Sequence, residues 1–378
     1  MSTRLQAVRR HLEYSAAQVI DLLIRRADAL NVPVMTHASL KTKLSRWENG
    51  HEDVSAPYRR LFREIYGRTN AELGFPTEDE DPEADELRSR LAMARTVDRD
   101  TVEIFRQQVE HARRIDRRFG GITQLDQLRA QIDQVQRLLA YGTARGHRQE
   151  LAAVLTEAST LAGWEALDRN AIGQAWQHYE RAKAAAREAD SPGLLAHATA
   201  EQAFALIDLD EGALAIEQLA DACALAEPVA PPLLRAWLAA AHGEGLAATG
   251  HRDAALRAFD TASGLLPTDP VNPAMPFLFL GDTHLERWRG HALARLSAPD
   301  AIDHLTSALA RLPSTFVRAR TGLLVDLAVA HAAAGDRDAA LSHARQARRL
   351  AAQIRSDRQQ RRLRALVLPG GATFGGTA

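Results

Sequence analysis

The chain has 378 residues, of which 46% are hydrophobic, 5% aromatic and 25% charged, and its formal net charge at pH 7 is −1. Because this length exceeds one typical hydrophobic core, we expect two domains or an extended repeat array. No run of about 18 apolar residues and no amino-terminal signal pattern occurs, which argues against membrane-spanning and secreted proteins, and the single cysteine, Cys223, predicts a cytoplasmic protein without internal disulfides.

The net charge divides unevenly along the chain. Residues 1–75 contain 12 Lys and Arg against 8 Asp and Glu, a net charge of +4, and the remainder contains 35 against 40, a net charge of −5. Two of the three lysines of the whole chain, Lys41 and Lys43, lie in this first segment. A positive potential concentrated in a small segment favours attraction to a polyanion.

Three short amphipathic helices are predicted in the first segment, at 15–23, 39–50 and 58–67. In the middle one, Leu40, Leu44 and Trp47 recur at helical spacing and form an apolar face. Its opposite face carries cationic and hydroxyl side chains, and Gly50 ends it because glycine adopts the left-handed conformation at no steric cost. Small helices around a basic middle member are typical of a helix-turn-helix domain, here residues 1–75.

Two runs resemble a known family. The run Ser-Arg-Trp-Glu-Asn-Gly at 45–50 and the segment 66–75 resemble the lambda-repressor-like (XRE) helix-turn-helix regulators of high-GC Gram-positive bacteria. The resemblance implies that the helix ending at 48–50 is the recognition helix, and that Trp47 and Glu48 are structural. It implies Lys41, Thr42, Lys43 and Arg46 as groove or phosphate contacts, and the predicted DNA-binding residues also include Ser39 and Ser45 of the same helix.

The sequence departs from the family's pattern in two places, and the basic helix has one alternative interpretation. Ala16 stands where the family commonly has glutamine, and the segment 27–38 is longer than the tight turn of phage repressors. The alternative is an ordinary amphipathic helix with a solvated basic face.

Residues 76–83 contain two prolines and a dense acidic run, which predicts an acidic linker. The segments 84–95, 98–119 and 123–141 are predicted as helices without a repeat signature. We assign residues 84–150 to connecting or capping helices, with dimerisation as a further role.

A repeated pattern runs through residues 151–366. A small residue is followed seven positions later by a turn residue, then by Ala, an aromatic or aliphatic residue and Ala at helical spacing. Its copies are Gly163, Asn170, Ala175, Tyr179 and Ala182; Ala203, Asp210, Ala215, Leu219 and Ala222; Gly243, Gly250, Ala255, Phe259 and Ala262; a weaker copy at Ala301, Leu305 and Ala308; and Ala328, Gly335, Ala340, Ala344 and Ala347.

These spacings resemble tetratricopeptide (TPR) repeats, although the step of 40 between the first copies exceeds the usual value of about 34. The region around 161–164 also resembles the sensor region of the same regulators. The predicted fold class is therefore all-α, with an amino-terminal helix-turn-helix domain followed by a TPR-like α-solenoid and a disordered tail at 367–378. A plain helical bundle is the structural alternative.

No catalytic pattern is present. The chain lacks HExxH, a GxxxxGK phosphate loop and a GxGxxG turn after a strand. We therefore expect no enzyme, no cofactor and no metal.

The inner helices of a TPR-like solenoid line a concave groove, so the repeats predict which residues line it. The predicted groove residues are Trp164, Asp168, His197, Phe204, Asp208, Trp237, Glu244 and Glu286. This mixture of aromatic and acidic side chains favours a peptide or small ligand with apolar groups and a positive group. The alternative is that the carboxylates are solvated and the aromatic residues belong to the core.

Taken with the resemblance, these features imply a cytoplasmic transcriptional regulator. It would bind double-stranded DNA as a homodimer on half-sites about one helical turn apart, without contact to membranes. The competing class is a TPR protein-interaction scaffold without specific DNA binding.

Overall fold

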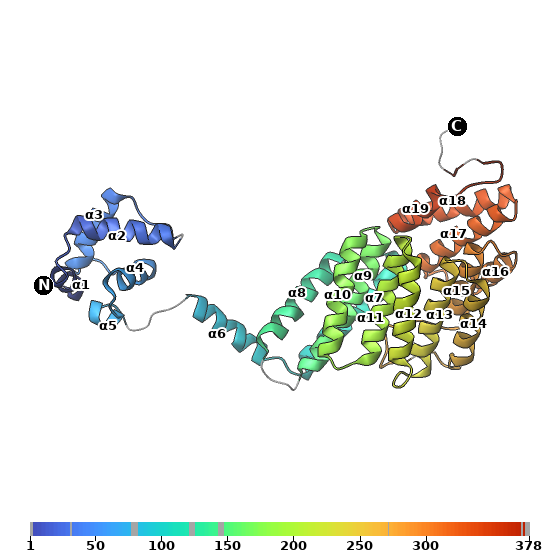
Figure 1. Cartoon of the computed structure of the whole chain (residues 1–378), viewed down its shortest axis with the longest axis horizontal. Helices are drawn as coiled ribbons and strands as arrows, with labels where there is room; N and C mark the ends of the chain where they lie inside the picture. The colour runs from blue at the N-terminus through green and yellow to red at the C-terminus, as the bar shows by residue number, and fades with distance from the viewer. Residues whose placement is uncertain are drawn as a thin grey trace. The chain divides into compact units, whose positions relative to one another are not determined.

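The structure is a computed structural model and describes residues 3–30, 32–76, 82–120, 125–142, 147–270, 272–371, 373 and 374. It confirms the all-α class: these residues form nineteen helices and one isolated β-bridge, between Val367 and Thr373. The chain divides into two compact units, unit 1 (Met1–Arg90) and unit 2 (Leu91–Ala378), shown in Figure 1. Among the described residues, no helix is both long and apolar enough to cross a membrane.

Unit 1 contains five short helices and the start of a sixth. Their bounds are α1 (Arg4–His11), α2 (Ala16–Ala29), α3 (His37–Glu48), α4 (Ala56–Tyr66), α5 (Asn70–Leu73) and α6 (Pro82–Arg95). The start and end of these helices are set by capping residues in the sequence. Ser15 and Gln18 form a capping box at the start of α2, and Gly67 ends α4 with φ at +58°.

The apolar face predicted for α3 is the face that unit 1 buries. Leu40 and Leu44 are fully buried, and Trp47 packs against the rings of Tyr58 and Phe62. The stop after this helix is also as predicted, since Gly50 has φ at +68°. Core packing therefore fixes which side of α3 faces solvent.

The predicted linker at 76–83 includes 77–81, which lie outside the described residues. The division between the units falls inside α6, further along the chain than the predicted linker. In the part of α6 whose side chains the structure describes, Ala94 alone is buried.

Unit 2 is a stack of antiparallel helix pairs, as expected for a TPR-like solenoid. The bounds are α7 (Arg99–Phe119), α8 (Leu125–Tyr141), α9 (Arg148–Asp168), α10 (Ile172–Glu188), α11 (Pro192–Asp208), α12 (Gly212–Ala226), α13 (Pro232–Ala248), α14 (Arg252–Leu265), α15 (Asp282–Arg295), α16 (Ala301–Arg311), α17 (Val317–Ala333), α18 (Arg337–Gln353) and α19 (Asp357–Arg364). The five predicted copies coincide with the five pairs from α9/α10 to α17/α18.

In the pairs α9/α10, α13/α14 and α15/α16, a large side chain on the second helix packs against a glycine on the first. A Cβ added at Gly163 would lie 2.7 Å from the ring of Tyr179, and one added at Gly243 would lie 3.0 Å from the ring of Phe259. Both rings are fully buried. The close approach explains why the repeat requires a small residue at its first position.

The turn residue of each copy adopts the left-handed conformation. Positive φ occurs at Asn170, Asp210, Gly250 and Gly335, residue types that tolerate this region. The weak fourth copy follows the same rule, because Ser297 also has positive φ and a Cβ at Gly290 would lie 2.8 Å from Leu305. The first half of this copy did not match the predicted spacing, because Leu305 comes fifteen residues after Gly290, whereas Tyr179 comes sixteen residues after Gly163.

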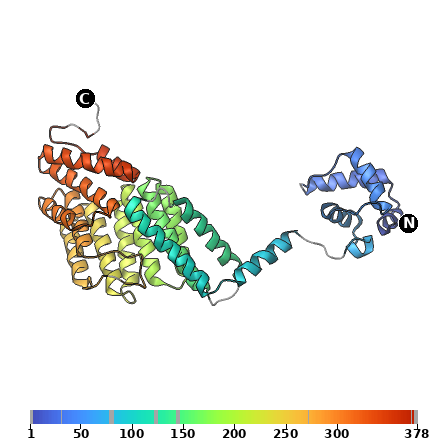
Figure 2. The same cartoon turned by 180° about the vertical axis from the view of Figure 1, so that it is seen from behind.

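Helices near the two ends of unit 2 contact each other. Helix α7 contacts α17, and α9 contacts α19, so green and red helices lie side by side when the unit is seen from behind (Figure 2). The two ends of the solenoid are therefore joined by helix contacts.

The stretch predicted as a disordered tail from 367 instead packs, as far as it is described, against the last repeat. Leu368 and Phe374 are buried with Leu324 and Val325, and the Phe374 amide donates a hydrogen bond to the Leu366 carbonyl. The burial of two large apolar side chains explains why this segment is ordered.

Candidate functional site

Helix α3 presents a polar surface in unit 1, which we call the α3 surface. Its members are Ser39, Lys41, Thr42, Lys43, Ser45 and Arg46. All are exposed except Lys43, which is half-buried. The ammonium group of Lys41 forms no ion pair with any residue that the structure describes, so its charge is available to a partner.

One acidic side chain neutralises part of the α3 surface. Glu52, in the loop after α3, forms an ion pair with Lys43, and its other oxygen lies 3.3 Å from Arg46 Nε. The hydrogen bond from Lys43 holds the pKa of Glu52 below its ordinary value. Glu52 is therefore ionised at neutral pH and competes with any anion for these two cations.

Glu48, at the end of α3, has a structural position. Its two carboxylate oxygens accept hydrogen bonds from Arg9 Nε at 2.5 Å and from an Arg9 terminal nitrogen at 2.8 Å. The carboxylate is buried, so this bidentate pair ties α1 to α3. Both Trp47 and Glu48 thus face inward, away from the α3 surface.

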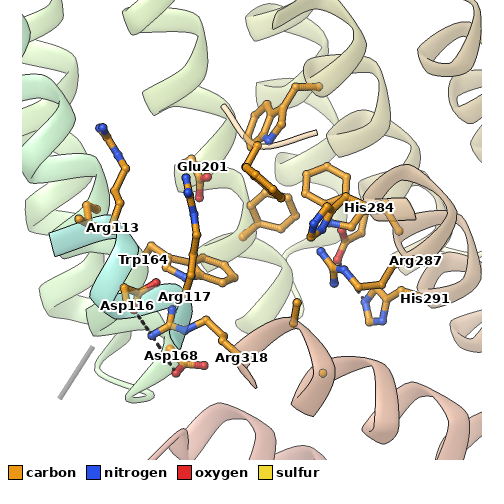
Figure 3. A pocket seen from close by; sticks show the side chains of 18 of the residues that line it. Arg113, Asp116, Arg117, Trp164, Asp168, Glu201, His284, Arg287, His291 and Arg318 are labelled. Carbon is orange, nitrogen blue, oxygen red and sulfur yellow. Dashed lines mark ion pairs between the residues drawn. The ribbon is translucent and has the colours of Figure 1, made fainter. Parts of the chain in front are cut away.

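Unit 2 contains a partly open cavity of about 280 Å³. The first helix of each pair lines it, together with α7, α19 and the segment between α14 and α15. Figure 3 shows side chains converging on this space from both sides: Arg113, Asp116 and Arg117 of α7 on one, and His284, Arg287 and His291 of α15 on the other. A volume of this order fits a small-molecule site.

The structure brings six of the eight predicted groove residues together in this cavity. These are Trp164, Asp168, His197, Phe204, Trp237 and Glu244. Asp208 is outside the lining because both its oxygens accept hydrogen bonds from Arg358, at 2.7 and 2.9 Å. Glu286 is outside because it lies on the face of α15 that packs on α16, where it hydrogen-bonds His304.

The carboxylates that the sequence placed in the groove are already paired. Asp168 accepts a hydrogen bond from Ser356 Oγ at 2.7 Å and lies 3.4 Å from Arg318. Glu244 lies 3.1 Å from His291 Nε2. The cavity therefore does not present these groups as free negative charge, and the prediction of a positively charged ligand loses its main support.

Several lining residues were missed by the sequence reading. They are chiefly the arginines Arg113, Arg117, Arg287, Arg318, Arg358 and Arg362, and the rings of Phe277, Phe279 and Phe316. The spacing of His284, Arg287, Trp288 and His291 along one face of α15 was the available signal. Helix α19 offered none, because it is not part of a repeat.

Aromatic side chains form the apolar wall of the cavity. Trp237 packs against the rings of His197, at 4.6 Å, and Trp288, at 5.6 Å between centroids. Burial lowers the pKa of His197 to about 3 and raises that of Glu201 to about 8. Near neutral pH both side chains are thus mostly uncharged, although they lie 3.7 Å apart.

Glu165 on α9 predicts a pH dependence of stability. Its side chain is fully buried, its two carboxyl oxygens make no hydrogen bond within the described structure, and burial raises its pKa to about 9. In the unfolded chain this carboxyl ionises near its ordinary value of about 4.3. Between these values unfolding releases a proton, so the free energy of unfolding falls as pH rises, by at most about 1.4 kcal/mol per pH unit.

The variant Glu165→Gln cannot release that proton. We expect its free energy of unfolding to fall less steeply than that of the wild type between pH 7 and 9, as measured by denaturant titrations. Glu150→Gln is the control, since Glu150 lies on the same helix and is exposed. Equal slopes for wild type and Glu165→Gln would show that this carboxyl is ionised in the native state.

Comparisons with known proteins bear on the fold alone. No protein-family model matches the chain, and no curated protein matches it. A similar solved structure is that of a Rap protein in complex with competence and sporulation factor, at 14% sequence identity and a TM-score of 0.45, with 94% of this chain and 98% of that chain covered. We base no functional conclusion on a similarity of this level.

Proposed function

We propose that the chain is a sequence-specific, DNA-binding transcriptional regulator. In this proposal unit 1 is a helix-turn-helix domain that binds double-stranded DNA through α3, and the TPR-like unit 2 binds an effector. The observation that carries the proposal is the α3 surface, in which hydroxyl and cationic groups occupy most of the solvent side of a helix whose apolar side is buried. Such a helix fits the major groove of B-DNA.

The side chains of the α3 surface divide by chemistry into two roles. Lys41, Lys43 and Arg46 supply charge to phosphates or hydrogen bonds to guanine, and Ser39, Thr42 and Ser45 supply short hydrogen-bonding groups. A homodimer would place two copies of α3 on half-sites about one helical turn apart.

Unit 2 supplies the means of regulation in this proposal. Its cavity is lined by the first helix of every pair together with α7 and α19. An effector bound there shifts the protein between two arrangements only through different affinities for them.

A second candidate function, a protein-interaction scaffold, is favoured by the position of Glu52. Its carboxylate pairs with both Lys43 and Arg46 and so lowers the positive charge of the α3 surface. The two functions predict different results when this charge is removed.

We expect Glu52→Gln to raise the affinity for duplex DNA by about 3- to 10-fold at low salt, because it frees two cations from ion pairs worth up to about 1 kcal/mol. The measurement is fluorescence anisotropy of a labelled duplex titrated with the full chain. Asp53→Asn is the matched control, since it removes the same charge from the next residue, which forms no ion pair with α3 in the described structure. Equal effects of the two variants, or none, would favour the scaffold.

A further inference from the structure

Three arginines that line the cavity form no ion pair with a carboxylate among the residues described: Arg117 on α7, and Arg287 and Arg295 on α15. Arg295 Nε donates a hydrogen bond to His291 Nε2 at 3.2 Å, so Arg117 and Arg287 are the two without a polar side-chain partner in that part of the structure. Other lining arginines do have a carboxylate partner. These pairs are Arg113 with Glu157 at 2.6 Å, Arg318 with Asp116 at 2.5 Å, Arg358 with Asp208 at 2.7 Å, and Arg362 with Asp326 at 2.6 Å. Arg117 and Arg287 thus carry positive charges that no described carboxylate pairs with directly.

Both arginine side chains are half-buried. Arg287 Nε is buried and makes no hydrogen bond to any described residue, and the Arg117 guanidinium lies over the Phe279 ring, 4.7 Å from its centroid. Burial lowers the pKa of each. An unpaired buried charge is costly, so an anion that pairs with it gains more than it would at the surface.

The two arginines act on one region of the cavity. The Phe279 ring beneath Arg117 also packs on the His284 ring, at 4.7 Å between centroids. Burial, then Arg287 and Arg117, lower the pKa of His284 to about 3. The neutral imidazole therefore lies within the field of both guanidinium groups, which approach from the two sides seen in Figure 3.

The carboxylates of the lining already have other partners, although Asp326 and Glu244 lie close enough to Arg287 to raise its pKa. The carboxylates Asp116, Glu157, Asp168, Glu244 and Asp326 each have an arginine or histidine partner. Glu201 is mostly protonated near neutral pH. Beside the two arginines, the rings of Trp237, Trp288 and Phe316 offer an apolar surface.

We infer that the cavity binds a small organic anion, whose carboxylate or phosphate group pairs with Arg117 and Arg287 and whose apolar body packs on the aromatic wall. This inference rests on the proposed function in one respect, that the cavity is an effector site. It replaces the positively charged ligand expected from sequence, because the unpaired charges in the cavity are cationic.

The test compares probes that share one aromatic body. We would titrate the full chain by calorimetry with 1-naphthylacetate, its neutral amide, 1-naphthylmethylamine and 1-naphthyl phosphate. The expected result is saturable binding of an anion at least about 10-fold tighter than binding of the amide and the amine. Carboxylate and phosphate are distinguished by which of the two anions binds more tightly.

The variants Arg287→Gln and Arg117→Gln should each weaken binding of the preferred anion by about 10-fold or more, with Arg287→Lys weakening it less. Arg289→Gln on α15 and Arg114→Gln on α7 are matched controls, since neither residue lines the cavity. Circular dichroism verifies that each variant is folded. Equal binding of anion, amide and amine, no saturable binding of any probe, or unchanged binding by the Arg287 and Arg117 variants would overturn the inference.

These titrations contain no DNA. A chain that fails to bind DNA can therefore still bind the anion, and a chain that binds DNA can fail with every probe. The two proposals stand or fall separately.

Discussion

Replacing Lys41, Lys43 and Arg46 together by alanine is expected to lower the affinity of the full chain for duplex DNA by roughly 100-fold or more. The three side chains lie on the α3 surface, and the core of unit 1 does not use them. If two of them contact phosphates, the negative slope of log affinity against log salt decreases by about 2 per protomer. Anisotropy titrations on a duplex of random sequence at several salt concentrations measure both quantities.

The control is a triple variant that removes the same charge elsewhere in unit 1. Arg10→Ala, Arg60→Ala and Arg68→Ala serve this purpose, because these exposed side chains lie outside α3. An equal loss in both triple variants would mean that DNA responds to the net charge of the unit. An unchanged salt slope in the α3 variant would remove its cations from the interface.

Replacing Arg358 by alanine is expected to lower the free energy of unfolding of unit 2 by about 3–5 kcal/mol, because it leaves a buried carboxylate without its main partner. Arg358 joins α19 to Asp208 on α11 through two hydrogen bonds, and both side chains are largely buried, with relative exposures of 11% and 7%. Arg361 lies 3.6 Å from the same carboxylate and can partly replace Arg358 as its partner. We therefore expect a loss of free energy of unfolding near the lower end of this range.

Denaturant unfolding of the full chain, followed by the helical signal in circular dichroism, measures this loss. Arg361→Ala is the matched control on the same helix. Because the Arg361 side chain is more exposed, its removal should lower the free energy of unfolding by less than about 1 kcal/mol. A loss for Arg358→Ala as small as that of the control would show that α19 does not hold the solenoid closed.

The repeat architecture could be predicted because it depends on local sequence. A small residue opposite a ring, as in Gly163 and Tyr179, and a left-handed turn residue, as in Asn170, recur at fixed spacing within one helix pair. The same regularity identified the helices that face inward, and six of the eight groove predictions follow from it. The copy containing Ser297 was weak because serine is not a typical left-handed residue and because that pair is one residue shorter.

The charge state of the cavity could not be predicted from local sequence. Asp208 and Arg358 are 150 residues apart, and Asp168 and Ser356 are 188 apart, so only the closure of the solenoid brings them together. Without those contacts, the sequence does not show that the acidic residues are paired or that some of the arginines line the cavity without a carboxylate partner. The sign of the unpaired charge therefore depends on tertiary contacts that no spacing rule contains.

In unit 1 the sequence located α3 and its buried side, but not the ion pairs of Glu52. Glu52 follows α3 in the chain and is one of several acidic residues in the segment. Its effect depends on the fold of the loop at Gly50, which turns the carboxylate back toward Lys43 and Arg46.

The measurement that tests the central claim most directly is affinity selection of fragmented genomic DNA from the source organism by the purified full chain. The recovered DNA is sequenced beside that recovered by the Lys41, Lys43 and Arg46 triple alanine variant. We predict that the wild type alone enriches a shared motif, with two half-sites about one helical turn apart. Equal recovery by both proteins without a common motif would contradict the assignment of the chain as a DNA-reading regulator.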